Sequence, residues 1–199
     1  ALIFAHFAQK AGLPSGALNV VPGLGSEAGA ALSAHPGVHH LSFTGSVVTG
    51  AAVQIAAGAN VVPVTLELGG KSPQVVFEDA DLDAALPFLV TAGLQNAGQT
   101  CSASSRILVQ DTLFDEVARR MATAYRSKTI GPATTDPDIG PLINATQKRR
   151  VEGFLAQAHD LPEIARATPP DGLQGHFVPA CLFGPVPPNH SLAQDEVFG

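Results

Sequence analysis

Short β-rich runs alternate with longer helical runs along the first third of the chain, and few folds accommodate that order. Hydrophobic periodicity and the positions of glycine and proline predict helices over residues 1–11, 26–34 and 46–57 and strands over residues 18–21, 40–44 and 61–66. Ser26 is the expected N-cap of the second helix. Helix and strand alternate throughout, which is typical of a parallel sheet covered by helices. The sequence therefore predicts an α/β fold for this part of the chain.

A second α/β pattern begins after a pair of glycines, Gly69 and Gly70. Here we predict strands over residues 74–77 and 106–110 and helices over residues 82–95, 112–127 and 145–158. Glycine- and proline-rich loops are expected over residues 130–142 and 168–190. We place a boundary at the glycine pair and expect two domains, residues 1–68 and residues 69–199.

Composition limits the classes of protein to consider. The chain has 199 residues, of which 45% are hydrophobic and 14% are charged, and this indicates a globular protein with a packed core. The charged fraction is low for a soluble domain, so we expect further chain or a partner subunit to cover part of the surface. The formal net charge is −6 and no basic run occurs, which argues against binding to nucleic acid.

Residues 41–66 carry no Asp, Glu, Lys or Arg, but glycines, an asparagine and a proline interrupt them, so we expect no membrane span. The two cysteines form no C-x-x-C pair, and the sequence begins without a leader pattern. We therefore expect a reducing, cytoplasmic setting. The histidines lack the spacing of a metal site, and no bound metal is expected.

Cys101 is the first candidate functional residue and lies in a predicted turn over residues 96–102. Small residues follow it, which would leave room for a substrate. Gly98 permits a tight turn whose backbone N–H groups would face the sulfur, favour the thiolate and hold an oxyanion. A buried, inert cysteine is the alternative that the local sequence leaves open. The other cysteine, Cys181, has no activating neighbour and is interpreted as structural.

Glu67 follows the predicted apolar strand over residues 61–66, a position where α/β proteins usually place functional groups. Apolar surroundings would make its carboxylate more basic, as a general base requires. Gly69 and Gly70 would let a flat ligand or another segment approach the backbone closely. The alternative is an ordinary surface glutamate paired with Lys71.

Two turns that join a strand to a helix are candidate phosphate sites. One comprises Phe43, Thr44, Gly45 and Ser46, and the other spans residues 22–25 and ends at Gly25. Free N–H groups at a helix start can bind phosphate, and Gly45 would let the phosphate come close. Neither turn matches the strict dinucleotide fingerprint, so an ordinary capped helix is the alternative.

Four segments together resemble motifs of the aldehyde dehydrogenase superfamily and occur in that family's order. They are residues 43–46 (Phe-Thr-Gly-Ser), 67–73 (Glu-Leu-Gly-Gly-Lys-Ser-Pro), 98–101 (Gly-Gln-Thr-Cys) and 196–199 (Glu-Val-Phe-Gly). The separation of 34 positions between Glu67 and Cys101 is also what this family shows. The resemblance covers essentially the whole chain. It implies an α/β fold of the aldehyde dehydrogenase type, of which this chain would contain part of a Rossmann-like domain followed by part of a catalytic domain.

The resemblance implies oxidation of an aldehyde to a carboxylic acid with NAD or NADP as the cofactor. Cys101 would attack the carbonyl of a small-molecule aldehyde, and Glu67 would activate the water that hydrolyses the resulting thioester. Glu196 would hold the nicotinamide ribose. The residues implied to contact the cofactor are Gly25, Gly29, Phe43, Thr44, Gly45, Ser46, Leu68, Gly69, Glu196 and Phe198.

The resemblance also implies a fragment, because chains of this family are more than twice as long. Residues 1–68 would be the C-terminal part of an NAD(P)-binding domain and residues 69–199 a truncated catalytic domain. The parent protein would be a homodimer or homotetramer, and the fragment alone is expected to have little or no turnover. Two alternatives stay open: a CoA-acylating semialdehyde dehydrogenase, which commonly lacks the glutamate found here as Glu67, and a non-catalytic structural or binding module.

Overall fold

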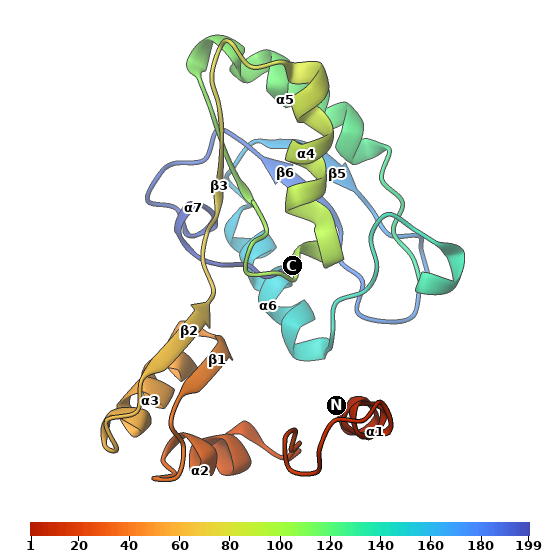
Figure 1. The fold of residues 1–199 in the computed structure, drawn as a ribbon. Helices are drawn as coiled ribbons and strands as arrows, with labels where there is room; N and C mark the ends of the chain where they lie inside the picture. The colour runs from red at the N-terminus through yellow and green to blue at the C-terminus, as the bar shows by residue number, and fades with distance from the viewer. The chain divides into compact units, whose positions relative to one another are not determined.

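The computed structural model describes all residues from 1 to 199 and divides them into two compact units, Ala1–Leu68 and Gly69–Gly199 (Figure 1). Each unit contains a pair of parallel strands together with helices. The predicted α/β fold with parallel sheets and covering helices is therefore confirmed. None of the helices combines the length and the apolar character needed to cross a membrane.

The first unit is built around a single parallel strand pair. Strand β1 lies beside β2 with Leu41 opposite Val64 and Gly45 opposite Leu68. Helix α3 packs along both strands (Figure 1). The elements in chain order are α1 (Leu2–Lys10), the π-helical turn η1 (Gly25–Gly29), α2 (Ala30–Ser33), β1 (Leu41–Gly45), α3 (Val47–Gly58) and β2 (Val64–Leu68).

Helix α3 has a clear start and a close approach to the strands. Ser46 is its N-cap, and the Ser46 hydroxyl accepts a hydrogen bond from the backbone N–H of Thr49 at 3.2 Å. A Cβ atom on Gly50 would lie 2.6 Å from a methyl carbon of Leu68, so glycine lets the helix come this close to β2. Local sequence therefore fixes both where α3 begins and which face meets the sheet.

Two local predictions in the first unit are wrong. Residues 18–21 form no strand, because β1 and β2 pair only with each other and no strand lies beside this run. Ser26 does not cap the following helix. The π-helical turn already begins at Gly25, with Leu24 as an N-cap that offers no side-chain hydrogen bond.

The second unit combines a parallel and an antiparallel strand pair. Strands β3 and β4 are parallel, whereas β5 and β6 are antiparallel. The main elements in chain order are β3 (Pro73–Val76), α4 (Leu82–Leu94), β4 (Arg106–Val109), α5 (Phe114–Arg126), α6 (Ala145–Gln157), β5 (Glu163–Ala167), β6 (Ala180–Phe183) and α7 (Ser191–Gln194). Short 3-10 turns connect them at η2 (Gln95–Gly98), η3 (Asp111–Leu113) and η4 (Ala133–Thr135).

The hydrophobic core of the second unit forms mainly under helix α5. Val117, Met121 and Tyr125 recur every four residues and share one buried face of that helix. They pack with Val76 of β3 and Leu89 of α4, and Met121 is only 1% exposed. A smaller cluster joins Ile130, Ile139, Ala167 and Phe177.

Strand β6 lies inside residues 168–190, which we predicted to be an irregular loop. Its partner β5 was not predicted either. The antiparallel pairing places Arg166 opposite Cys181 and Ala167 opposite Ala180. A strand that is defined by pairing across an intervening loop leaves little trace in its own sequence, and the surrounding prolines concealed this one.

Candidate active site

The segment that carries Cys101 is an unusual turn at the end of helix α4. We call residues 96–102 the cysteine turn. Asn96, Ala97 and Gly98 have φ values of 51°, 55° and 76°, so three consecutive residues are left-handed. Asparagine and glycine tolerate this conformation, whereas alanine does so at a cost. Side-chain bonds offset that cost: the Asn96 amide donates to the Gln99 carbonyl at 2.9 Å, and the Gln99 amide donates to the Asn96 carbonyl at 3.1 Å.

Cys101 itself is exposed, so the alternative of a buried, inert cysteine does not hold in this structure. The hydroxyls of its neighbours Thr100 and Ser102 lie 3.0 Å apart and bond to each other. The expected N–H donors to the sulfur are not found, because no backbone group donates a hydrogen bond to it. The backbone N–H of Cys101 has no acceptor either and is free to bind a ligand.

Gly98 ties the cysteine turn to the end of the chain. Gly98 is buried, and a Cβ atom on it would lie 2.8 Å from the carbonyl carbon of Gly199. No other residue would fit there, and the positive φ independently favours glycine. The cysteine turn therefore lies directly against residues 195–199, which we call the C-terminal loop.

Glu196 of the C-terminal loop reaches the start of the second unit. Its carboxylate accepts a hydrogen bond from the backbone N–H of Gly70 at 3.3 Å, and a Cβ atom on Gly69 would collide with the same carboxylate. Nearby, burial and the charge of Arg106 lower the pKa of Lys71, against the opposing effect of Asp195 and Glu196. The structure thus brings together Gly69 and Glu196, two of the residues assigned from the sequence to the cofactor.

Phe198 is two residues beyond Glu196 and has a φ of 61°, which is rare for an aromatic residue. It lies in the C-terminal loop between Glu196 and Gly199, the residue that contacts the cysteine turn. The loop therefore joins the predicted nucleophile region to the predicted ribose-binding residue within the second unit.

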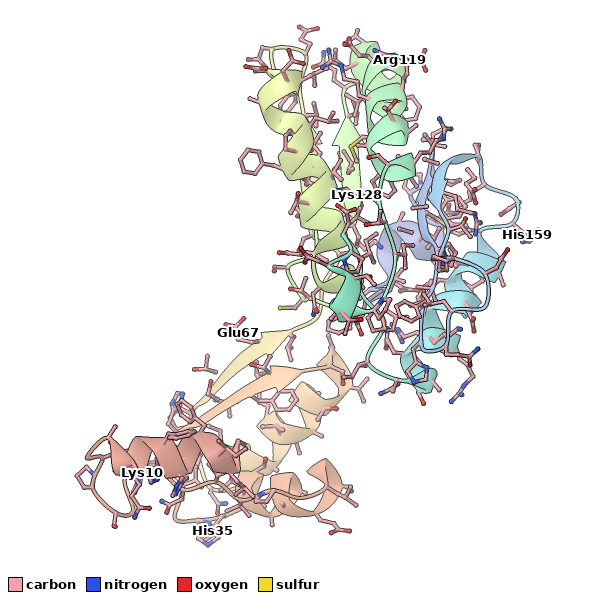
Figure 2. All side chains as sticks on the ribbon, turned by 90° about the vertical axis from the view of Figure 1, so that its right-hand side faces the viewer. Lys10, His35, Glu67, Arg119, Lys128 and His159 are labelled. Carbon is pink, nitrogen blue, oxygen red and sulfur yellow. The ribbon has the colours of Figure 1, made fainter.

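Glu67 belongs to the first unit and lies on β2 (Figure 2). The parallel register sets Thr44 opposite Glu67 and Gly45 opposite Leu68. The predicted phosphate turn and the predicted base therefore share the carboxyl end of one strand pair. The side chain of Glu67 is exposed, so the apolar surroundings expected from the sequence are not found in this unit.

The remaining predicted cofactor residues lie at two helix starts. The ring of Phe43 folds over Gly45, where a Cβ atom would lie 2.6 Å from the ring. Ser46 caps α3, and the N–H groups of Val47 and Val48 have no acceptor. Gly25 and Gly29 form the two ends of η1, with open space where side chains would be. The free donors at the start of α3 suit an anionic group.

A cavity of about 360 Å³ in the second unit reaches Ala97 and Gly98 of the cysteine turn but is not lined by Cys101. It lies between β4 and β6 beneath α5, and Cys181 lines it. Burial raises the pKa of the Cys181 thiol to about 11, although Arg166 opposes the shift, so this thiol stays protonated at neutral pH. Because β4 and β6 are each paired on one side only, we interpret the cavity as space between two sheet edges rather than a substrate pocket.

Three side chains without a predicted role hold these segments in place. Gln99 accepts a hydrogen bond from the backbone N–H of Ile143 at 2.8 Å, just before α6. Gln147 and Arg150 of α6 donate to carbonyl oxygens of the C-terminal loop. These contacts join residues that are far apart in sequence. Only the spacing of three positions that puts Gln147 and Arg150 on one helix face is readable from the sequence.

Comparison with known proteins places this arrangement in a family. The model of the "Aldehyde dehydrogenase family" matches residues 1–199. "Aldehyde dehydrogenase [NAD(P)+] 1" of Saccharomyces cerevisiae is 38% identical over 208 residues, which cover 100% of this chain and 41% of the yeast protein. A crystal structure from Burkholderia cenocepacia, assigned as an aldehyde dehydrogenase, is 53% identical with a TM-score of 0.97 and covers 100% of this chain and 42% of that one.

A second solved structure adds a ligand-bound example. A cysteine-to-alanine variant of aldehyde dehydrogenase C from Pseudomonas syringae, in complex with NAD+ and octanal, is 35% identical with a TM-score of 0.93 and covers 100% of this chain and 42% of that chain. The present chain spans about 40% of the length of the relatives that it matches. A family model that matches every residue, together with relatives of this similarity, shows that the chain belongs to the aldehyde dehydrogenase family.

Proposed function

We propose that this chain is part of an enzyme that oxidises an aldehyde to a carboxylic acid with NAD+ or NADP+, through a covalent intermediate on Cys101. The observation that carries the proposal is the exposed Cys101 in a turn that packs against the loop bearing Glu196. A nucleophile and a polar ligand-binding group on adjacent segments are what such a reaction requires. The NAD(P)+ in the name of the yeast relative and the NAD+ and octanal bound to the Pseudomonas enzyme support the cofactor and the substrate class.

The residues present fit a dinucleotide. The free N–H groups of Val47 and Val48 at the start of α3 suit the pyrophosphate. The Glu196 carboxylate makes one hydrogen bond, of 3.3 Å, and so retains acceptor sites for ribose hydroxyls. Phe43, Thr44, Gly45, Ser46, Gly25, Gly29, Leu68, Gly69 and Phe198 are the further proposed contacts. When bound, the cofactor supplies the acceptor for the hydride that leaves the aldehyde carbon.

Cys101 carries the covalent chemistry in this proposal. Its thiolate attacks the aldehyde carbonyl, a C–S bond forms, and the carbonyl oxygen becomes an oxyanion. The backbone N–H of Cys101, which has no acceptor within the protein, is available to donate to that oxyanion. Loss of hydride from the carbon then leaves a thioester on the sulfur.

Glu67 completes the cycle in this proposal. Its carboxylate takes a proton from water, the resulting hydroxide forms a C–O bond to the thioester carbon, and the C–S bond breaks. Cys101 leaves as a thiolate and the product is a carboxylic acid. The exposed position of Glu67 at the end of a strand leaves its carboxylate accessible to water.

The test is a pair of cysteine variants in the full-length protein. We expect Cys101→Ala to abolish NAD(P)H formation from every aldehyde in a panel, because no covalent adduct can form. Cys181→Ala is the matched control and should retain activity, since Cys181 lines a cavity that Cys101 does not line. Normal turnover by the Cys101→Ala variant would overturn the assignment of the nucleophile.

A second measurement separates hydrolysis from transfer to another thiol. With Glu67→Gln we expect a burst of NAD(P)H followed by slow turnover, because the thioester forms but is hydrolysed slowly. Acyl-CoA as the main product when CoA is added to the wild-type enzyme would instead support a CoA-acylating activity. We expect the 199-residue chain alone to show little or no turnover.

A further inference from the structure

The C-terminal loop has little regular structure of its own, yet it carries Glu196. Helix α7 ends at Gln194, Asp195 is extended, and Phe198 is left-handed. The backbone carbonyls of the C-terminal loop accept no hydrogen bond from a backbone N–H group. The direction of the Glu196 carboxylate therefore depends on whatever holds this backbone in place.

Helix α6 supplies that support through two side chains. The Gln147 amide donates to the carbonyls of Val197 at 3.1 Å and Phe198 at 2.7 Å. The Arg150 guanidinium donates to the carbonyls of Val197 at 3.3 Å and Glu196 at 2.5 Å. Four hydrogen bonds thus hold three successive carbonyl oxygens, and the two from Arg150 come from a positively charged donor, which strengthens them.

Further contacts of α6 restrict the positions of these two side chains. Gln147 and Arg150 are three positions apart on one face of a helix of 13 residues that Asn144 caps. The Arg150 guanidinium also lies over the ring of Phe154, 5.4 Å from its centroid, which restricts its orientation. Gly199 packs against Val151 of the same helix, and Figure 1 shows the C-terminus beside α6.

The same part of the chain holds the cysteine turn. The Gln99 side chain accepts from the Ile143 N–H at 2.8 Å, immediately before α6, and Gly98 packs against Gly199. The cysteine turn and the loop that carries Glu196 are thus both held by residues at or just before the start of one helix, α6. A shift of that helix would move both.

We propose that Gln147 and Arg150 are positioning residues: by holding the carbonyl oxygens of residues 196–198 they direct the Glu196 carboxylate toward the ribose hydroxyls of the cofactor. This inference rests on the proposed function. Neither side chain needs to touch the cofactor, because each acts through the backbone that carries Glu196.

The first experiment measures the loop without any ligand. Arg150→Met and Gln147→Met are made in the full-length protein, and hydrogen exchange is followed over residues 69–71 and 195–199. Arg149→Met is the matched control, because it removes the same charge from the next position, where Arg149 donates only to Thr146. Faster exchange in both segments of the two test variants alone supports the proposal. Unchanged exchange overturns it.

The second experiment measures the Kd of NAD+ and NADP+ by fluorescence titration. We expect each test variant to raise the Kd about tenfold, which is about the size of one lost hydrogen bond, while Arg149→Met leaves it unchanged. In the Glu196→Ala background, Arg150→Met should add little, because the two residues act as one unit. An equal tenfold effect in both backgrounds would overturn action through Glu196.

A wild-type protein that binds neither dinucleotide would refute the proposed function. The exchange experiment would still decide whether side chains of α6 hold the C-terminal loop.

Discussion

The two units of this chain bury their apolar residues very differently. Among the buried hydrophobic residues, only Leu41 and Ala57 belong to the first unit, whereas the second unit has a continuous core around Met121. Apolar side chains such as Phe4 and Val48 of the first unit are 70% and 82% exposed. All five ion pairs also lie in the second unit.

This difference indicates which unit could fold without the rest of the protein. Burial of apolar area is the main source of stability, and large exposed apolar surfaces usually mark contacts with other chain or with a partner. The second unit therefore has a hydrophobic core of the kind an independent domain requires. The first unit instead exposes apolar surface that we expect other protein to cover. The low fraction of charged residues in the sequence comes mainly from the first unit, whose apolar side chains are also the more exposed.

The largest expected effect comes from the core of the second unit. Met121→Ala should lower the free energy of unfolding by about 2–5 kcal/mol, because it removes a buried side chain and leaves a cavity. Denaturant titration measures this loss. The matched control is Phe88→Ala on α4, whose ring is 74% exposed and whose removal should cost far less. Equal losses would mean that the core does not carry the stability of this unit.

Helix caps in the two units give the next largest effect. Asp81 accepts hydrogen bonds from the backbone N–H groups of Asp83 and Ala84, so Asp81→Ala should destabilise α4 by about 1 kcal/mol. Ser46→Ala should have a similar local cost on α3 but leave hydrogen exchange of the second unit unchanged. Hydrogen exchange measures this, because the exchange rates of residues 1–68 and of residues 69–199 can be followed separately. A shift of both units by Ser46→Ala would show that they unfold together.

A smaller effect should be present at neutral pH and disappear in acid. The Lys128 ammonium, with the backbone N–H and hydroxyl of Thr129, holds the pKa of Asp138 well below its usual range. The stability from this ionised carboxylate is complete above the ordinary aspartate pKa of about 3.9 and is lost as the pH falls further. Asp138→Asn should cost less than about 1 kcal/mol at neutral pH and flatten the acid dependence of unfolding. Asp171→Asn, at an exposed position, should leave that dependence unchanged.

The smallest expected effect tests the uncovered surface of the first unit. Val48→Ala on α3 should change the free energy of unfolding of the 199-residue chain by less than about 0.5 kcal/mol, because Val48 is 82% exposed. The same substitution in the full-length protein sharpens the comparison. A loss there of the size expected for a buried valine would show that this face of α3 is covered in the complete molecule.

Features encoded within a few residues could be predicted from the sequence. The α/β class and helices near residues 46–57 and 82–95 follow from periodicity together with local caps such as Ser46 and Asp81. The strand expected over residues 18–21 was wrong because pairing, not composition, creates a strand. Strands β5 and β6 were missed for the same reason, since each is defined by a partner beyond a proline-rich loop.

The candidate site shows the same division. A turn at Cys101 was readable from Gly98 and its small neighbours, and the structure contains one. The support from Gln147 and Arg150 was not readable, because it joins α6 to carbonyl oxygens 46 to 51 positions away. Side-chain to backbone contacts of this range depend on the folded arrangement rather than on any local motif. The catalytic roles of Cys101 and Glu67 stay predictions.

The contrast between the two thiols has a practical consequence for spectroscopy. Cys101 is exposed on a turn, whereas Cys181 faces an apolar cavity and keeps its proton at neutral pH. A maleimide dye or a nitroxide spin label should therefore attach at a single place in this chain without any engineered cysteine. The label would report on the movement of residues 96–102 when a dinucleotide or an aldehyde is added.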